Sequence, residues 1–478
     1  MEAGLPADGQ TSAATRPATG IVHLGLGAFF RGFGCVYVAD AMAASGGDWG
    51  IAGVSLRSPA TRDALRLRDW RYTSVTLAPE GEAPRDISVL NDVLVAPEDP
   101  EAVLAIMADP AVRIVTLTVT EKGYCHNPAT GELNLDHPDI QHDLTQDLPV
   151  SAPGFLVRAL ARRKANGTAP FTVLTCDNLP KNGKLVRGMV LQLASRIDPA
   201  LADWIAQEGR FPSTMVDRIT PATTDADIAR ITTLTGTPDA APVLHEPFSQ
   251  WAVEDDFVGN ARPALEDAGV EMVVDVTAHE DMKLRMLNGT HSALAYTGYL
   301  VGHETIADTV ADRDFARYAR ALWDEIMPAV TAPEGVSLTD YADALMSRYA
   351  NPAIRHRTWQ IAMDGSQKLP QRILGTVRDN LDAGRSVEGL CTAIAAWMRY
   401  VSGTDEAGEC IDVRDPLADR LHALAQAQNS PADIVAALLS VEEIFPADMA
   451  VRLQDPVTRA ATVLWDKGVR AAIARGVS

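Results

Sequence analysis

The chain of 478 residues has little positive charge, few cysteines and no long apolar segment. Its 42 lysines and arginines are outnumbered by 63 aspartates and glutamates, which gives a formal net charge of −21. Such a chain repels a nucleic-acid backbone and an anionic bilayer, so we expect neither as a partner. Because no run of 18 apolar residues occurs, we also expect no membrane-spanning helix.

The cysteines show no pattern that indicates a disulfide framework or a metal site. They are scattered, lack a C-x-x-C pair and are odd in number, which favours reduced thiols in a cytoplasmic protein: Cys35, Cys125, Cys176, Cys391 and Cys410. We therefore expect no metal ligands. Residues 1–20 lack the apolar core of a signal peptide and are expected to form a flexible tail.

The two halves of the chain differ in their predicted secondary structure. Up to about residue 280, short apolar segments alternate with helical ones, which predicts a parallel sheet covered by helices, with strands at 21–24, 49–56, 113–120, 171–175 and 272–276. Beyond that point the chain is expected to be almost entirely helical, with helices at 281–301, 313–327, 338–349, 386–400 and 433–439. We therefore predict an α/β domain at 21–280 and an all-α domain at 281–478.

A glycine pair follows the first predicted strand. Gly25 and Gly27 stand where a strand turns into a helix beginning near Ala28 and Phe29, which is where the pyrophosphate of a dinucleotide binds in Rossmann-type domains. Phe30 occupies the place of the usual third glycine, so an ordinary strand-to-helix turn is an equally weighted alternative. No acid follows the second strand, and Arg57 there could contact a 2′-phosphate, so the choice between NAD and NADP stays open.

Two further groups of polar residues indicate chemistry. At α-helical spacing, Asn288 lies about 140° and His291 about 80° from Lys283, so the three residues fit one broad helical face suited to proton transfer. The alternative is a solvated lysine and a helix irregularity at Asn288. Asn178 follows the predicted strand 171–175, where ligands bind to parallel sheets, although a simple turn is also possible there.

The stretch 355–372 is locally basic within an acidic chain, as an anionic substrate would require, or else forms salt bridges. The neighbouring residues Asp217 and Arg218 are interpreted as an ion pair.

Taken in order, five motifs resemble the polyol-specific long-chain dehydrogenase/reductase family: GLGAFFR (25–31), TVTEKGY (118–124), CDNLPKNG (176–183), FPSTMVDRITP (211–221) and KLRMLNGTHSALAY (283–296). The resemblance implies a Rossmann-type N-terminal domain, an all-α C-terminal domain and hydride exchange between NAD(P) and a substrate carbonyl without a metal. It also implies a small sugar acid or polyol as substrate. A monomer or small homo-oligomer is expected.

The resemblance assigns a role to each candidate residue. Lys283 is implied as general acid and base, Asn178 and Asn288 as amides that hold the reacting oxygen, and His291 as a substrate-orienting group. The implied cofactor contacts are Gly25, Gly27, Ala28, Phe29, Arg57, Glu121 and Lys122. The implied substrate contacts are Asp217, Arg357, Lys368 and Arg372.

Two details favour the sugar-acid branch of the family over its mannitol branch. Lys122 replaces a glycine of the mannitol enzymes, and Gln360 replaces an arginine. We therefore expect interconversion of D-fructuronate and D-mannonate, with a hexitol 2-dehydrogenase as the alternative. The chain departs from the family in one respect: it lacks two histidines that members of the family commonly have after the glycines. The alternative from another functional class is a sensor that binds a dinucleotide but has lost catalysis.

Overall fold

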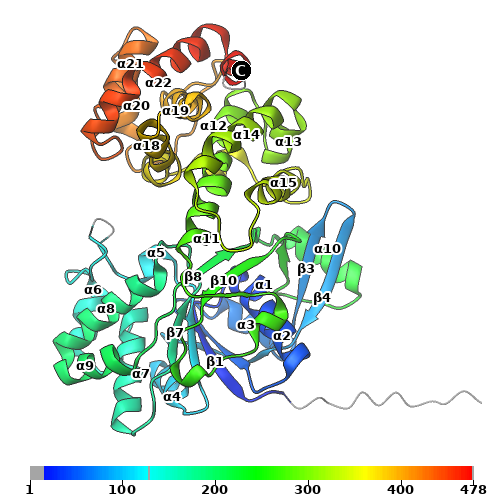
Figure 1. Ribbon diagram of the computed structural model, residues 1–478. Coiled ribbons are helices and arrows are strands. Elements are labelled where there is room, and N and C mark those ends of the chain that lie inside the picture. The colour runs from blue at the N-terminus through cyan, green and yellow to red at the C-terminus, as the bar shows by residue number, and fades with distance from the viewer. Residues whose placement is uncertain (1–15, 128–129, 476–478) are drawn as a thin grey trace, which may run out of the picture. The chain divides into compact units, whose positions relative to one another are not determined.

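The computed structural model describes residues 16–127 and 130–475, which divide into two compact units (Figure 1). The first unit holds the chain up to Leu77 together with Glu82–Val276, and the second holds Ala78–Gly81 and the chain from Thr277 onward. Residues 1–15 of the expected tail lie outside the described residues. The first strand begins at Thr19, two residues before the start expected from the sequence.

The first unit is built on a parallel sheet of five strands in the order β5-β2-β1-β6-β7. The strands are β1 Thr19–Leu24, β2 Gly50–Ser55, β5 Leu90–Val95, β6 Ile114–Leu117 and β7 Thr172–Thr175. The inner strands β2, β1 and β6 are buried almost throughout because helices cover both faces of the sheet. The predicted Rossmann-type architecture is confirmed.

Each face of this sheet has its own apolar core. Val22 and Val54 point toward one core, which four helices complete: α4 Pro100–Ala108, α7 Ala152–Ala165, α8 Asn182–Ile197 and α9 Pro199–Glu208. Ile21 and Ile51 point the other way, toward α1 Ala28–Gly32, α2 Gly34–Ser45 and α3 Ala60–Arg66. This alternation follows from the two-residue period of a strand. The remaining helices of the unit are α5 Thr120–Gly123, α6 Pro138–Thr145 and α10 Asp225–Thr235.

Two smaller sheets complete the unit, in the orders β11-β10-β8 and β4-β3-β9. Their strands are β3 Tyr72–Ala78, β4 Gly81–Ile87, β8 Thr214–Asp217, β9 Val243–His245, β10 Gln250–Glu254 and β11 Glu271–Val273. The strand expected at 272–276 is thus shorter and belongs to a small sheet. Short 3₁₀ turns lie at Val258–Asn260 and Leu265–Ala268.

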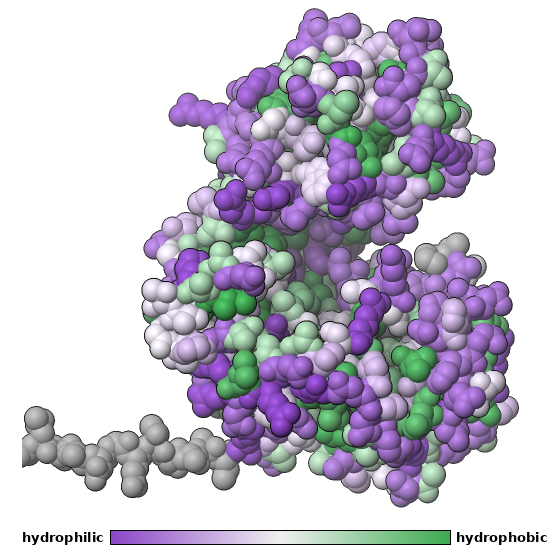
Figure 2. All heavy atoms as spheres, turned by 180° about the vertical axis from the view of Figure 1, so that it is seen from behind, coloured by the Kyte–Doolittle hydropathy of each residue, from purple (hydrophilic) through white to green (hydrophobic). Residues whose placement is uncertain are grey.

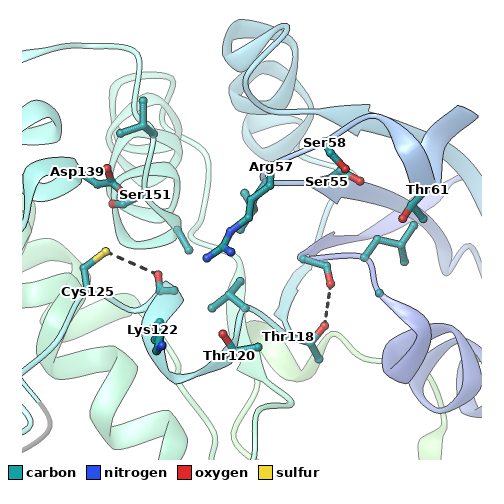
Figure 3. A pocket seen from close by; sticks show the side chains of 18 of the residues that line it. Ser55, Arg57, Ser58, Thr61, Thr118, Thr120, Lys122, Cys125, Asp139 and Ser151 are labelled. Carbon is teal, nitrogen blue, oxygen red and sulfur yellow. Dashed lines mark hydrogen bonds between the residues drawn. The ribbon is translucent and has the colours of Figure 1, made fainter. Parts of the chain in front are cut away.

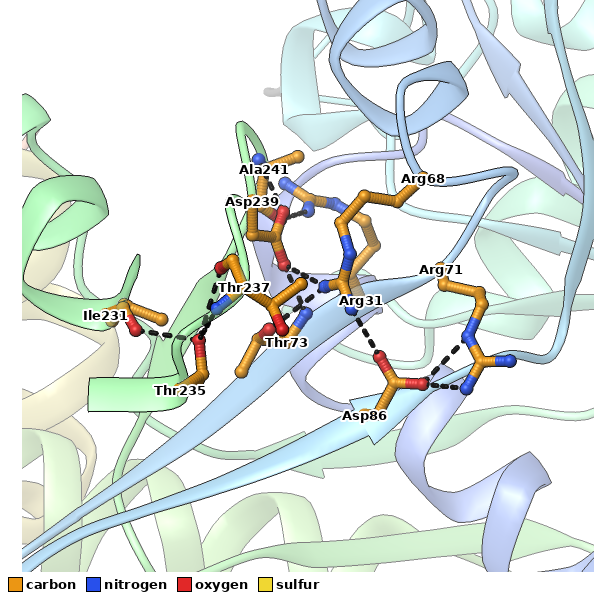
Figure 4. Close-up of polar contacts among 10 residues, drawn as sticks. All are labelled: Arg31, Arg68, Arg71, Thr73, Asp86, Ile231, Thr235, Thr237, Asp239 and Ala241. Atoms are coloured by element: carbon orange, nitrogen blue, oxygen red, sulfur yellow. Dashed lines mark hydrogen bonds and ion pairs between the residues drawn. The ribbon is translucent and has the colours of Figure 1, made fainter. Parts of the chain in front are cut away.

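A buried carboxylate fastens the sheet β4-β3-β9 to the rest of the unit (Figure 4). Asp239 accepts hydrogen bonds from the backbone N–H groups of Thr73 (2.6 Å) and Ala241 (2.9 Å) and from Arg68 (2.7 Å). Arg31, the last residue of the motif at 25–31, is buried and donates to the carbonyl of Ala241 at 2.5 Å. Arg31 therefore supports the fold next to the turn at Gly25 and Gly27, which we call the glycine turn.

As predicted, the longer secondary-structure elements of the second unit are all helices. Its helices are α11 Thr277–Met282, α12 Thr290–Leu300, α13 Ile306–Ala311, α14 Arg313–Ile326, α15 Leu338–Tyr349, α16 Thr358–Ala362, α17 Gly365–Leu369, α18 Gly375–Asp382, α19 Glu388–Val401, α20 Ala418–Gln426, α21 Pro431–Leu439, α22 Ala447–Lys467 and α23 Val469–Arg475. Helices α12 and α19 are buried on nearly all sides and pack against each other, so they form the centre of the unit. A 3₁₀ turn spans Met327–Ala329.

The helix expected at 281–301 is interrupted. A π-helical segment, Lys283–Gly289, separates α11 from α12, and a second one, Pro370–Leu374, separates α17 from α18. The two segments contact each other at Gly289, where a β-carbon would come within 2.8 Å of the carbonyl oxygen of Arg372. Any larger residue at Gly289 would push the two segments apart.

The face of the molecule drawn in Figure 2 is mostly hydrophilic, with apolar residues in small patches. Within residues 16–127 and 130–475, no helix combines the length and the apolar character needed to cross a bilayer.

Candidate active site

The first unit contains a cavity at the carboxyl ends of β1, β2 and β6, which we call the strand-end cavity (Figure 3). Its volume is about 670 Å³, and its lining includes Gly25, Gly27, Ser55, Arg57, Ser58, Thr61, Thr118, Thr120, Lys122, Cys125, His137, Asp139 and Ser151. Ligands of open parallel sheets bind at this end of the strands. The location and size therefore suit a dinucleotide.

The glycine turn has the conformation that close approach of a phosphate requires. Gly25 has φ +91°, and a β-carbon there would come within 2.3 Å of the carbonyl oxygen of Thr118. The N–H groups of Gly25 and Leu26 donate to the carbonyl of Val54, which holds the turn at the end of β2. Gly27 faces open space, with its nearest neighbour 3.8 Å from an added β-carbon. The residues present thus fit a pyrophosphate at this turn.

Phe30 replaces the third glycine without disturbing this arrangement. Its buried ring stacks on His23 with the centroids 3.4 Å apart, and Gly34 makes room for it, since a β-carbon at Gly34 would meet the ring at 2.3 Å. The close packing that a third glycine usually provides is therefore supplied by Gly34. Ala28 and Phe29 begin α1, and Phe29 stacks on Phe33 at 5.0 Å, so neither residue lines the strand-end cavity.

Arg57 follows β2 and points into the cavity, between Ser58 and Thr61 on one side and Cys125 and Asp139 on the other (Figure 3). Among the described residues that line the cavity, no carboxylate lies at the end of β2. Lys122 also lines the cavity, whereas Glu121 is exposed and does not.

The loop after β6 is held by a carboxylate that the sequence analysis did not single out. Asp177 accepts hydrogen bonds from the N–H groups of Val119 (2.8 Å) and Thr120 (3.0 Å) and from the hydroxyl of Tyr124 (2.7 Å). Burial raises the pKa of Asp177, while these three donors act in the opposite direction. The bonds keep Thr120 in a left-handed conformation, with φ +64°. Asn178 is the next residue and is exposed at the end of β7.

Asp217 ends β8 and is buried in the first unit. Its neighbour Arg218 donates to the carbonyl oxygens of Gly32 (2.7 Å) and Glu246 (3.3 Å). The guanidinium of Arg218 therefore braces the backbone next to the glycine turn.

In the second unit, the π-helical segment changes the relation between the predicted catalytic residues. The angle of about 140° between Lys283 and Asn288 holds for an α-helix, whereas the segment Lys283–Gly289 is π-helical and bonds residue i to residue i+5, which brings these two residues closer to one face. Lys283 is buried, with 8% of its surface exposed. Arg285 is anchored by Asp281 (2.6 Å) and Asp379.

His291 lies in a buried cationic environment in the same unit. Its ring contacts those of Tyr349 and His356, with centroid separations of 5.1 and 4.6 Å. Burial holds the pKa of His291 well below its usual value, and the positive charges of Arg372, Arg348 and Lys368 lower it further. Burial also lowers the pKa of His356 to about 4. Both imidazoles are therefore neutral near pH 7.

The basic stretch 355–372 divides into two parts, and the salt-bridge interpretation holds for its outer part. Arg355 and Arg357 are exposed and pair with Glu304 at 3.2 and 3.7 Å. Lys368 donates to the carbonyl of Met363 at 2.6 Å, and burial together with Arg372 lowers its pKa to about 8. These contacts place the outer arginines in surface salt bridges.

Arg372 is the deeply placed cation of this stretch. Its Nη1 donates to the hydroxyl of Ser292 at 3.0 Å, and burial lowers its pKa from the usual range. Ser292 adjoins His291 on α12. The structure therefore brings together His291, His356, Lys368 and Arg372, and it adds Arg348, which the sequence analysis missed because α15 carries no motif.

Both units are similar to known proteins. Residues 19–267 match the family model of the mannitol dehydrogenase Rossmann domain, and residues 275–464 match that of the mannitol dehydrogenase C-terminal domain. The chain is 48% identical to an uncharacterized oxidoreductase, YeiQ, of Escherichia coli K12, covering 90% of this chain and 88% of that protein. It is 42% identical to the D-mannonate oxidoreductase of the same organism, with 99% of both chains covered.

A solved structure is also similar over nearly the whole chain. It is the mannitol 2-dehydrogenase of Pseudomonas fluorescens in a ternary complex with NAD and D-mannitol, which superposes with a TM-score of 0.83 at 38% identity and covers 97% of this chain and 94% of that one.

Proposed function

Because the chain belongs to the mannitol dehydrogenase family of oxidoreductases, we propose that it interconverts D-fructuronate and D-mannonate with NAD as the hydride carrier. The observation that carries the choice of a sugar acid is Arg372, a largely buried guanidinium beside His291 that donates to the neutral hydroxyl of Ser292. Lys368 differs from it, because its amine pairs with Asp364 at 4.0 Å. A guanidinium bonds a carboxylate more strongly than a neutral hydroxyl, so a sugar acid offers Arg372 a better partner than a neutral hexitol does.

The strand-end cavity would hold the dinucleotide. Gly25 and Gly27 would receive the pyrophosphate, and Arg57 and Lys122 supply positive charge along the walls. Bound there, the nicotinamide would donate or accept the hydride at its C4 atom. The complex of the Pseudomonas relative with NAD supports this choice of cofactor, and the missing acid after β2 makes NADP the second cofactor to assay.

The proposed proton donor is Lys283. When the ketone is reduced, its ammonium gives a proton to the substrate oxygen, and it takes the proton back when the alcohol is oxidised. Asn288, one π-turn away, and Asn178 are proposed to donate hydrogen bonds to that oxygen as negative charge develops on it. A neutral His291 then orients a substrate hydroxyl as donor or acceptor without adding a charge.

Among the candidate carboxylate ligands we favour Arg372. Its guanidinium is buried next to His291, and a planar guanidinium can bind a carboxylate through two hydrogen bonds. Arg357 is turned toward Glu304 on the surface, and the amine of Lys368 is already bonded to a backbone carbonyl.

The alternative is a mannitol 2-dehydrogenase that interconverts D-mannitol and D-fructose, and the similarity to the mannitol-bound structure favours it. Both functions are tested by following the oxidation of NADH and of NADPH with fructuronate and, separately, with fructose. We expect turnover with fructuronate. Turnover with fructose alone would refute the sugar-acid assignment, and tight dinucleotide binding without either turnover would favour a sensor.

A further inference from the structure

Three side chains with different ligand atoms meet at one wall of the strand-end cavity. They are Cys125, two residues beyond the end of α5, and His137 and Asp139 at the start of α6. A thiol sulfur, an imidazole nitrogen and a carboxylate oxygen from these residues all lie within 4.8 Å of one another. The sequence spacing did not reveal this group because the cysteine is separated from the other two residues by a loop.

The geometry is close to that of a zinc site. A tetrahedral zinc ion with bonds of about 2.0–2.3 Å holds its ligand atoms roughly 3.3–3.8 Å apart, so side-chain movements of about 1 Å would close the group around the ion. Nδ1 of His137 lies 4.0 Å from Oδ2 of Asp139 and accepts a long hydrogen bond of 3.2 Å from the Asp139 N–H. A metal bound at Nδ1 would replace that weak bond.

The backbone around the three side chains is well fixed. Cys125 adopts a left-handed conformation with φ +53°, and its N–H donates to the carbonyl of Lys122. Asp143, on the same helix as Asp139, accepts hydrogen bonds from the N–H groups of Val150 (2.8 Å) and Ser151 (3.1 Å), which fastens α6 to the start of α7. The ligands thus need no large rearrangement to bind an ion.

The three kinds of ligand atom favour zinc over magnesium and calcium. Sulfur, nitrogen and oxygen together suit Zn²⁺, whereas Mg²⁺ and Ca²⁺ prefer oxygen ligands alone. The thiolate and the carboxylate would neutralise the two charges of the ion, and the thiol proton would be released to the solvent on binding. Three protein ligands leave a fourth position open, and all three residues line the cavity.

We propose that Cys125, His137 and Asp139 bind a zinc ion, and that this ion opposes dinucleotide binding in the strand-end cavity. The second clause rests on the proposed function, because the three ligands line the same cavity as Gly25, Gly27 and Arg57. Figure 3 shows Cys125 and Asp139 across the cavity from Ser58 and Thr61, with Arg57 between them. An ion there would occupy part of this volume and engage Asp139, whose carboxylate faces Arg57 across the cavity.

The first test measures metal binding by untagged, metal-free full-length protein in which the exposed Cys410 is replaced by serine. Added Co²⁺, which substitutes for Zn²⁺, should bind with one equivalent and give a thiolate-to-cobalt absorption band. In this background Cys125→Ser should abolish the band, and His137→Asn and Asp139→Asn should weaken binding at least about tenfold. His142→Asn, on the same helix but outside the group, is the matched control and should bind normally.

A band that persists in Cys125→Ser, or the absence of saturable binding in the Cys410→Ser background, would overturn the metal site. The second test titrates NADH with and without one equivalent of Zn²⁺. Zinc should raise the dissociation constant of NADH at least about tenfold, and Asp139→Asn should remove the effect. An unchanged constant with zinc bound would overturn the antagonism. A protein that binds zinc but never NADH would refute the proposed function and leave the metal site intact.

Discussion

Replacing Asp177 by asparagine tests the contact that shapes the loop after β6. In the native protein, one carboxylate oxygen accepts from Val119 and Tyr124 and the other accepts from Thr120. An asparagine has one oxygen, so its amide nitrogen must face at least one backbone N–H that then has no acceptor. A hydrogen bond to a charged group contributes about 1.5–3 kcal/mol, and burial of the charge offsets part of this. We expect Asp177→Asn to lower the free energy of unfolding by about 2 kcal/mol.

Urea denaturation measures this loss, and NADH titration measures its consequence for the cavity. Tyr124→Phe removes one of the three donors and should lower the free energy of unfolding by about 1 kcal/mol. The variant that carries both substitutions should lose less than the sum of the two single losses, because the two side chains share one hydrogen bond. Asp109→Asn, at an exposed position where the carboxylate accepts a hydrogen bond from Ala111, is the control and should change stability by less than about 0.5 kcal/mol. An Asp177→Asn protein as stable as the control, with unchanged NADH affinity, would refute the reasoning.

Three further predictions concern the second unit and the buried histidines. Lys283→Ala should lower kcat at least about 100-fold and leave the NADH dissociation constant unchanged; a variant that keeps most of its activity would disprove the proton-transfer role. Arg372→Met should raise the KM for fructuronate at least about tenfold, whereas Arg357→Met should not; equal effects would remove the distinction between them. Because burial lowers the pKa values of His245 and His356 to about 4, the unfolded chain binds more protons than the folded one between pH 4 and 6.5. Stability should therefore fall as the pH is lowered through that range, by at most about 3 kcal/mol per histidine, and His245→Gln should reduce the fall in urea titrations; an unchanged fall would contradict this origin.

The sequence was sufficient for the architecture because its signals are local. The apolar strands β1, β2 and β6 are recognisable from composition, and Gly25 and Gly27 mark the turn where β1 meets the cavity. The small sheets were not predicted, because strands as short as β9, with three residues, carry too little periodicity. Helix α22 has 21 residues and contains Pro456. Because a proline usually breaks a helix, the sequence did not indicate one helix of this length.

The details of the candidate site depend on contacts between distant segments, and this is why sequence spacing misjudged them. The π-helical geometry of Lys283–Gly289 accompanies the close approach of Gly289 to the carbonyl of Arg372, more than 80 residues away. Likewise, the fold turns Arg357 toward Glu304 and Arg372 toward Ser292, although both arginines belong to one basic stretch. Asp177 was part of a recognised motif, yet its three donors come from another strand end.

We propose that this chain transfers a hydride between a nicotinamide dinucleotide and a sugar acid. It is tested most directly by incubating the protein with fructuronate and NADH that carries deuterium at both C4 positions, followed by mass spectrometry of the product. We predict mannonate that has gained one deuterium at the former carbonyl carbon, and no such product from Lys283→Ala. Recovery of unlabelled fructuronate, while fructose under the same conditions yields a deuterated hexitol, would contradict the account.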